Sequence, residues 1–182
     1  MTVIKFKNFT KISEEEKRLV LEWRNSDRVR QKMANTEIIS LENHLKFVES
    51  LKTRKDCRYY LFCVDDVPVG VYDIVDIKED GSGGVGGSYI GDTNYLGYGL
   101  LISFIINDKF FKHSKTNTKF YVMKNNKRTF LMHKNIFGAE IDSEDEKQWN
   151  LFITPESWNK RRDYLLETIY KPLNISDVIW ED

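Results

Sequence analysis

Residues 94–101 have the composition of an anion-binding turn, because Gly97 and Gly99 precede a segment rich in Leu, Ile and Phe. Glycine lets the backbone approach a ligand closely. The first amides of a helix lack partners within the helix and lie at the positive end of its dipole. Such a turn between a strand and a helix can bind pyrophosphate. Because Gly-x-Gly is also common in ordinary turns, the stretch predicts either a pyrophosphate site or a plain surface turn.

Composition excludes several other classes of function. Lys and Arg total 28 and Asp and Glu total 28, so no net positive charge attracts nucleic acid. No run approaches the roughly 20 apolar residues that a bilayer span requires. Cys57 and Cys63 have neither a metal-site spacing nor a disulfide framework, and we expect buried reduced thiols and no metal. The sequence predicts a cytoplasmic protein with neither a nucleic acid nor a membrane as a partner.

The length of 182 residues suits a single domain spanning the whole chain. Ser13 and Glu16 have capping-box spacing, which predicts a helix up to about Asn25. Ser40 precedes a second amphipathic helix that runs to about Lys52. Apolar periodicity predicts further helices at residues 101–111, 126–135 and 155–170. The strand pattern recurs at residues 3–6, 59–64, 67–77, 88–90, 119–123 and 149–153.

Several connections between these elements are also predictable. An acidic turn at residues 65–66 makes the second and third strands an antiparallel hairpin, and Gly70 is expected to mark a bulge or bend. The glycine-rich residues 81–87 are expected to form a loop, either a mobile substrate loop or a plain hairpin. Residues 155–182 form an expected C-terminal helical extension, which either docks on the domain or makes a dimer contact.

Two motifs resemble those of the GNAT superfamily of acyl-CoA-dependent N-acyltransferases. The cofactor motif, Gln/Arg-x-x-Gly-x-Gly/Ala, appears at residues 94–99 with Asn94 in the first position. The later motif of Asn, a helix and then Gly-Phe appears within residues 122–137, ending at Phe137. The resemblance implies an α/β fold with a mixed, mostly antiparallel central sheet, splayed central strands and flanking helices.

The resemblance also implies how acetyl-CoA would be held as co-substrate. The strand at residues 88–91 would splay from that at residues 120–123, so that backbone amides pair with pantetheine and form an oxyanion hole. The residues implied to bind the cofactor are Ile90, Leu96, Gly97, Tyr98, Gly99, Leu100, Asn125 and Asn126.

The superfamily commonly protonates the departing thiolate with a tyrosine on the helix after the asparagine motif, and this chain has no tyrosine in that helix. Counting forward from Asn126 places His133 at that position, whereas counting back from Phe137 places Met132 there. Adjacent helical residues point about 100° apart, so only one of them can face the thioester. His133 is the candidate catalytic acid. With Met132 in its place, water would protonate the thiolate.

Residues 21–25, 39–41 and 44–47 are similar to the N-acetyltransferases of pseudaminic acid biosynthesis, which act on a UDP-linked 4-amino sugar. The similarity implies that Arg24 pairs with nucleotide phosphate, Met33 borders the base and His44 lies near the sugar. Arg24 could instead be a surface charge at a helix end. His44 lies on an apolar helical stripe, where a core histidine with satisfied hydrogen bonds is the alternative.

The expected function is transfer of acetyl from acetyl-CoA to the amino group of a UDP- or dTDP-linked amino sugar in surface-glycan biosynthesis. The expected partner is therefore a small nucleotide sugar, with a homodimer possible. One alternative acceptor is a protein N-terminus or a free small amine. The other alternative is an acyl-CoA-binding module without turnover.

Overall fold

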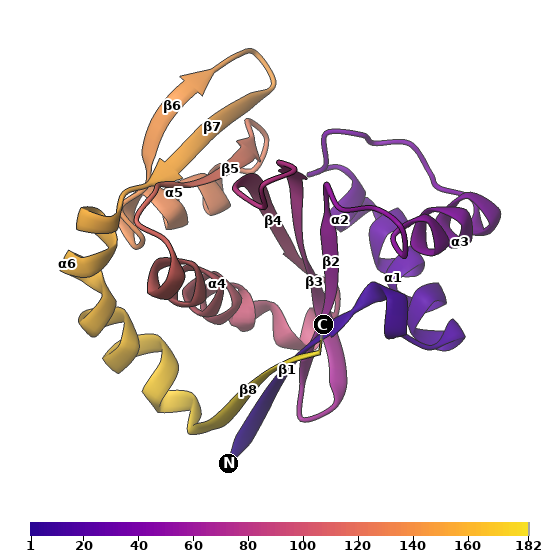
Figure 1. Cartoon of the computed structure of the whole chain (residues 1–182), viewed down its shortest axis with the longest axis horizontal. Helices are drawn as coiled ribbons and strands as arrows, with labels where there is room; N and C mark the ends of the chain where they lie inside the picture. The colour runs from indigo at the N-terminus through magenta and orange to yellow at the C-terminus, as the bar shows by residue number, and fades with distance from the viewer. Residues whose placement is uncertain (182) are drawn as a thin grey trace. The chain divides into compact units, whose positions relative to one another are not determined.

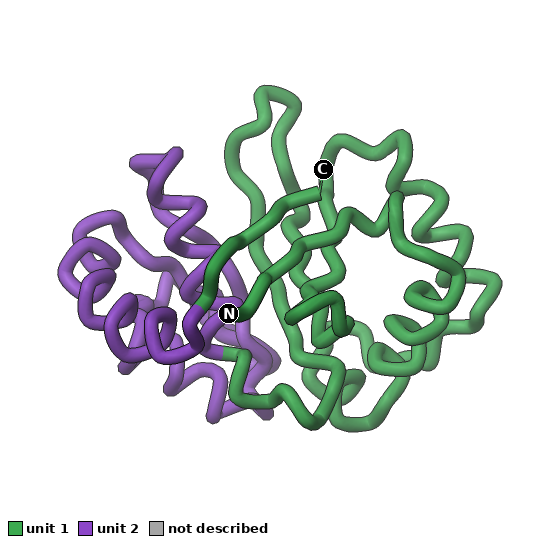
Figure 2. Tube along the Cα trace, turned by 90° about the horizontal axis from the view of Figure 1, so that it is seen from below, with its two compact units in different colours: residues 1–99, 175–182 green, residues 100–174 purple. Residues whose placement is uncertain are grey.

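The computed structural model describes residues 1–181 and divides into two compact units. The first contains Met1–Gly99 and the C-terminal residues from Ile175 onward, and the second contains Leu100–Asn174 (Figure 2). The expectation of one domain over residues 1–182 stays a prediction. The expected mixed α/β fold with mostly antiparallel pairing is confirmed, because β1 (Thr2–Asn8) pairs in parallel with β8 (Ile175–Glu181), whereas five other strand pairs are antiparallel.

Five strands form the sheet of the first unit in the order β4-β3-β2-β1-β8 (Figure 1). They are β1 (Thr2–Asn8), β2 (Arg58–Val64), β3 (Val67–Ile77), β4 (Gly83–Ile90) and β8 (Ile175–Glu181). The last of these corrects the expected helical extension, because residues 175–181 pair in parallel with β1. Trp180 stacks on Phe6 with ring centroids 3.9 Å apart, so the C-terminal strand is anchored by an aromatic contact.

The β2–β3 hairpin has the predicted acidic turn and bulge. Asp65 and Asp66 have φ angles of 50° and 65°, the left-handed conformation that a two-residue hairpin loop needs. The register shifts between Phe62 and Cys63, opposite Gly70. A Cβ on Gly70 would lie 2.4 Å from the carbonyl oxygen of Tyr89, so this glycine allows the neighbouring strand to approach.

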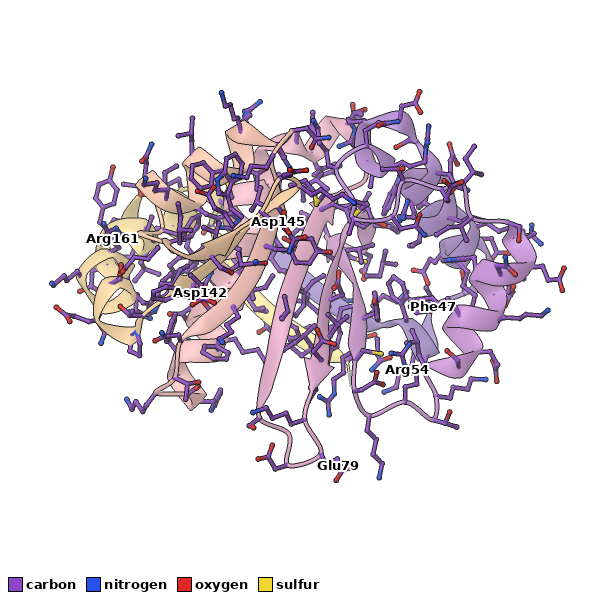
Figure 3. The ribbon with its side chains drawn as sticks, turned by 90° about the horizontal axis from the view of Figure 1, so that it is seen from above. Phe47, Arg54, Glu79, Asp142, Asp145 and Arg161 are labelled. Carbon is purple, nitrogen blue, oxygen red and sulfur yellow. The ribbon has the colours of Figure 1, made fainter. Side chains whose placement is uncertain are left out.

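Of the two alternatives for the glycine-rich segment, the structure has the hairpin, and residues 83–87 are part of its second strand instead of a loop. β4 begins at Gly83, and the β3–β4 turn carries Glu79 at its tip (Figure 3). Pairing with β3 overrides the loop-like composition, because β3 side chains occupy the space above the glycines. A Cβ on Gly84 would meet the Ile74 side chain at 2.7 Å, and one on Gly87 would lie 3.0 Å from Asp73 Oδ1.

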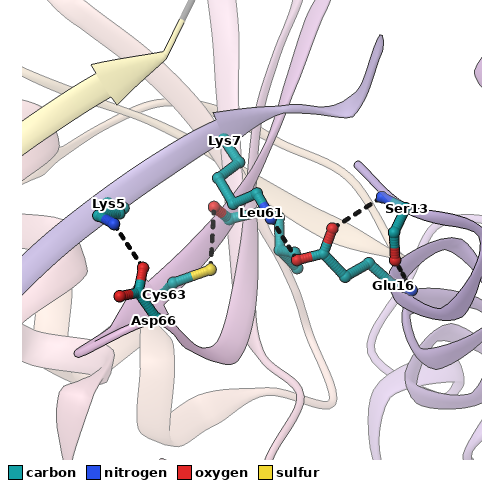
Figure 4. A network of polar contacts seen from close by, with 7 residues as sticks. All are labelled: Lys5, Lys7, Ser13, Glu16, Leu61, Cys63 and Asp66. Carbon is teal, nitrogen blue, oxygen red and sulfur yellow. Dashed lines mark hydrogen bonds and ion pairs between the residues drawn. The ribbon is translucent and has the colours of Figure 1, made fainter. Parts of the chain in front are cut away.

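The helical elements of the first unit are η1 (Phe9–Lys11), α1 (Glu14–Asn25), α2 (Asp27–Arg30), α3 (Leu41–Ser50) and η2 (Thr93–Tyr98). The predicted capping box is confirmed, since Ser13 Oγ accepts from Glu16 N–H at 3.2 Å and Ser13 N–H donates to Glu16 Oε2 at 2.8 Å. Glu16 also forms an ion pair with Lys7 of β1, which joins helix and sheet (Figure 4). The two cysteines are buried free thiols, as expected.

The core between sheet and helices in this unit is apolar. It comprises Phe9, Ile12, Val20, Trp23, Val48, Leu51, Cys57, Leu61, Cys63 and Val71. Phe47, Tyr59 and Tyr89 pack against it and are partly buried.

The second unit contains a three-stranded antiparallel arrangement, β6-β7-β5, with helices. Its elements are α4 (Gly99–His113), β5 (Thr118–Met123), α5 (Lys127–Asn135), β6 (Glu140–Glu144), β7 (Gln148–Ile153) and α6 (Pro155–Leu165), followed by a π turn at Leu166–Tyr170 and a 3-10 turn at Lys171–Leu173. Trp158 of α6 lies 5.6 Å from the Phe104 ring of α4, and Arg162 pairs with Asp108 at 2.6 Å. These contacts support docking of residues 155–165 on α4.

Within residues 1–181, no helix is both long and apolar enough to cross a membrane.

We expect Trp180→Ala to lower the free energy of unfolding by about 3 kcal/mol, because it removes the ring stacked on Phe6 and leaves a cavity. Urea unfolding followed by circular dichroism measures this change. Ile38→Ala is the control, because Ile38 is 71% exposed and its loss should change stability little. Equal stability of Trp180→Ala and the wild type would contradict the anchoring role of β8.

Candidate active site

The Gly-x-Gly segment lies between strand β4 and helix α4, as predicted. It is a 3-10 helix, η2, rather than a bare turn, and Asp92 Oδ1 caps it by accepting from Asn94 N–H at 2.8 Å. Gly99 has φ −58° and ψ −34° and begins α4, and its amide donates to the carbonyl of Leu96. The Gly99 amide, which was predicted to be available to pyrophosphate, therefore already has a hydrogen-bond partner within the chain.

The backbone at the two glycines is open. A Cβ on Gly97 or on Gly99 would have no atom within 4 Å apart from the neighbouring backbone. Leu96 is 52% exposed, and no acidic residue lies in the first turn of α4. A negative group can therefore approach the backbone at these two glycines and the first turn of α4, with the nearest acid of the segment, Asp92, at the opposite end of the 3-10 helix.

Two contacts fix the end of β4. The Gly91 N–H donates to the Val69 carbonyl at 2.8 Å, so the polar groups of Ile90 point away from β3. Arg28 Nη2 donates to the carbonyl oxygens of Ile90 at 2.9 Å and Gly91 at 2.5 Å. Because the Ile90 carbonyl is taken, its N–H is the group at this position that is suited to pantetheine. Cofactor binding by Ile90 stays a prediction.

Arg24 lies where α1 ends and holds the loop that carries Met33. Its Nη2 donates to the Asn35 carbonyl at 2.6 Å. The Asn25 side chain makes two bonds to Ile39, donating to its carbonyl at 2.8 Å and accepting from its amide at 2.9 Å. The structure thus places Arg24 and Met33 in one locally clamped segment, which is compatible with their predicted roles but does not test them.

His44 lies apart from this segment. Its side chain is buried at 5% exposure and forms a hydrogen bond with the backbone of Lys17. Burial lowers the pKa of His44, so the imidazole is neutral at pH 7. Lys17 precedes Arg24 by two turns of α1, about 10 Å along the axis. The structure does not bring His44 beside Arg24. The ring is buried as a core histidine would be, but its Nε2 has no hydrogen-bond partner among the described residues, so its hydrogen bonds are not all satisfied. Its sugar contact stays a prediction.

His133 of α5 packs between aromatic rings in the second unit. Its ring centroid lies 4.5 Å from that of Phe120 and 5.7 Å from that of Phe137. Nδ1 is buried and has no hydrogen-bond partner among the described residues. Burial lowers the pKa of His133 to about 4, so the ring is neutral at pH 7 and lacks the proton that an imidazolium acid would donate. This environment argues against the predicted catalytic role, which stays untested.

The two asparagines predicted to contact the cofactor lie at the start of α5. Asn126 is the N-cap residue, but its side chain makes no capping hydrogen bond. Asn125 precedes it and is exposed. Either amide can serve a ligand at this helix end, and the choice between them stays open.

Sequence reasoning missed two polar residues on the helix-covered face of the first sheet, Asp73 and Tyr89. The signal for Asp73 was present, because an acid stands in the strand sequence Val-Tyr-Asp-Ile-Val where alternation places it on the core face. Tyr89 has a pKa raised by burial, with Asp73, Arg24 and Arg28 among its electrostatic neighbours.

Comparison with known proteins shows which class of protein this chain resembles. No protein-family model matches the chain. An acetyltransferase PseH of Campylobacter jejuni is 32% identical over 133 residues, which are 72% of this chain and 82% of that protein. The crystal structure of Campylobacter jejuni N-acetyltransferase PseH in complex with acetyl coenzyme A matches with a TM-score of 0.66 and 26% identity, over 83% of this chain and 98% of that one.

A third match, FdhC, is described as a nucleotide-linked sugar GNAT. It has a TM-score of 0.69 and 18% identity over 90% of this chain and 92% of that one, a likeness that shows the fold alone. The fold, together with the glycine segment at the start of α4, is that of an acetyl-CoA-dependent N-acetyltransferase. Within that class, the chain belongs to the PseH family of acetyltransferases.

We expect Gly97→Val to weaken acetyl-CoA binding at least tenfold while the protein remains folded. Open space around Gly97 tolerates the new side chain, but the side chain would occupy the predicted place of the pyrophosphate. Calorimetric titration measures the affinity and circular dichroism the fold. Thr93→Val, which introduces the same residue type into the same 3-10 helix without adding volume, is the control. Unchanged affinity of the Gly97 variant would remove the pyrophosphate from this segment.

We expect acidification from pH 7 to pH 5 to destabilise the wild type by about 2 kcal/mol more than His133→Gln. The folded-state pKa of His133 lies below the unfolded value of 6.5, so the stability it contributes is present above pH 6.5 and lost as pH falls toward 4. Urea unfolding at the two pH values measures this difference. His113→Gln, which removes an exposed imidazole, should behave like the wild type. Parallel losses in all three proteins would place His133 in a solvated environment.

Proposed function

We propose that this protein transfers the acetyl group of acetyl-CoA to the amino group of a nucleotide-linked amino sugar, with UDP or dTDP as the nucleotide. The observation that carries the proposal is its 32% identity to acetyltransferase PseH over most of both chains. The acyl donor follows from the PseH structure that contains acetyl coenzyme A. Arg24 and the loop with Met33 supply a guanidinium and an apolar side chain suited to a nucleotide.

In the proposed reaction, a neutral amine attacks the thioester carbonyl and backbone amides stabilise the resulting oxyanion. The segment beginning at Leu96 holds the pyrophosphate, and the Ile90 amide pairs with pantetheine. The departing thiolate takes its proton from water, because His133 is neutral and a thiol pKa of about 8.5 makes an unassisted departure feasible. At the departure of the thiolate, the protein contributes proximity and amide electrostatics.

We place this reaction in the cytoplasm, where reduced thiols such as those of Cys57 and Cys63 are maintained. A homodimer is compatible with the proposal but is not required by it.

The test combines binding and turnover in one preparation. Acetyl-CoA is titrated calorimetrically, and thiol release is then followed after addition of a UDP-linked 4-amino sugar. Binding with thiol release and formation of the N-acetyl sugar is the expected result. Binding without release to this acceptor or its dTDP analogue would overturn the proposed acceptor, and absence of binding would overturn the proposed donor.

We expect Arg24→Ala to raise the KM for the nucleotide sugar about 10- to 100-fold, the worth of a hydrogen-bonded guanidinium-phosphate contact. The KM for acetyl-CoA should change little. Steady-state kinetics with each substrate varied in turn measure both values. Arg18→Ala, which removes an exposed guanidinium from the same helix, is the control. An unchanged KM for the sugar in Arg24→Ala would exclude Arg24 from phosphate binding.

A further inference from the structure

Asp73 occupies an unusual position for a carboxylate. It lies on β3 between Tyr59 of β2 and Gly87 of β4 in the strand register. Alternation along β3 places it on the same face as Val71 and Val75, which belong to or pack against the apolar core under α1 and α3. A charged side chain on this face is therefore surrounded mainly by apolar and aromatic groups.

The carboxylate reaches across the neighbouring strand. A Cβ on Gly87 would lie 3.0 Å from Asp73 Oδ1 and 3.1 Å from Oδ2, so the carboxylate stands above the Gly87 backbone. A larger residue at position 87 would displace it. Gly87 directly precedes residues 88–90, the part of β4 proposed to hold the thioester end of acetyl-CoA. The glycine thus permits a carboxylate to lie beside that segment.

Nothing in the described part of the chain neutralises this group. No described residue donates a hydrogen bond to the Asp73 carboxylate or forms an ion pair with it, whereas the buried Asp108 has Arg162 and Lys112. Its electrostatic neighbours are Cys57, Tyr72 and Tyr89, whose pKa values are raised and which are neutral at pH 7. The guanidinium groups of Arg24 and Arg28 act on the Tyr89 phenol.

Asp73 is half-buried, and partial burial of an unpaired carboxylate is unfavourable because the charged form loses much of its hydration without compensation. Desolvation raises the pKa of Asp73 from 3.8 to about 7. At physiological pH the group therefore exists in both protonation states and can exchange a proton with a ligand. A carboxyl group in this range has the basicity that general base catalysis requires.

We propose that Asp73 is the general base that deprotonates the amino group of the acceptor before it attacks acetyl-CoA. This inference rests on the proposed function for the nature of the acceptor and for the position of the thioester. In this role the carboxylate would contact the reacting nitrogen, and Asp73 would be catalytic in that sense.

The step balances in protons and electrons. The Asp73 carboxylate takes one proton from the acceptor ammonium, which leaves a neutral amine with a free electron pair. That pair forms the C–N bond to the thioester carbonyl, and collapse of the tetrahedral intermediate breaks the C–S bond. The second proton of the nitrogen passes through water to the thiolate, giving the amide and free thiol. Asp73 then returns its proton to solvent.

The test compares Asp73→Asn with the wild type and with Asp76→Asn, which removes an exposed charge from the same strand. We expect kcat/KM of Asp73→Asn to fall at least 100-fold at pH 7, within the range that general bases contribute. Asp76→Asn should stay within about twofold of the wild type. The acetyl-CoA affinity should be equal in all three, because the substitution leaves the glycine segment unaltered.

The pH profile separates a catalytic role from a structural one. The kcat/KM of the wild type should rise with pH through an ionisation near 7, and that ionisation should be absent from Asp73→Asn. Asp73→Asn should also unfold at a higher temperature than the wild type at pH 8, with the gain shrinking toward pH 4. A raised folded-state pKa means that the stability contributed by Asp73 is complete below the unfolded pKa and lost as pH rises through 7.

Failure of this inference is distinguishable from failure of the proposed function. A wild type that does not acetylate any nucleotide-linked amino sugar overturns the proposed function and, with it, the role of Asp73. A wild type that turns over the sugar, with Asp73→Asn equally active or with no ionisation near 7 in its own profile, overturns the inference alone.

Discussion

The end of β4 is held by close packing of Trp23 on Gly91, and both candidate binding segments of the first unit depend on this contact. A Cβ on Gly91 would lie 2.0 Å from the indole, so only glycine permits the approach. Arg28 reinforces it through the last carbonyls of the strand. Trp23 directly precedes Arg24, and Gly91 directly precedes Asp92, the N-cap residue of the 3-10 helix with Gly97. One contact therefore fixes the residue proposed for the nucleotide relative to the segment proposed for pyrophosphate.

The glycines of β4 have a related role along the rest of the strand. Glycine in a strand interior weakens the strand, since it loses more backbone entropy on folding and offers no side chain for packing. At Gly84 and Gly87 the missing side chains are replaced by those of Ile74 and Asp73, which lean over from β3. The composition of β4 is thus explained by what β3 places above it. The segment acquires its order through pairing with β3 and not from its own propensity.

Features with local causes were predictable from the sequence, and features with distant causes were not. The capping box at Ser13, the acidic turn at Asp65 and the start of α4 at Gly99 each depend on neighbours a few residues away. Strand β8 was missed because its partner, β1, lies at the other end of the chain, where Thr2 pairs with Ile175. The glycine-rich strand was mistaken for a loop because tertiary pairing overrode composition. The site was predicted only where a motif indicated it, and Arg24, Met33, Asn125 and Asn126 remain assignments by resemblance.

Asp73 and His133 show why the site could not be completed from residue types alone. The pKa of each side chain is shifted by desolvation, which disfavours its charged form. The pKa of the histidine moves from 6.5 to about 4 and leaves the physiological range, whereas that of the carboxyl moves from 3.8 to about 7 and enters it. By residue type the histidine is the expected proton carrier, and by environment it is the aspartate. The reaction agrees with this reversal. A thiolate with a conjugate pKa of about 8.5 can leave without an acid from the protein, but an ammonium cannot attack until a base has taken its proton.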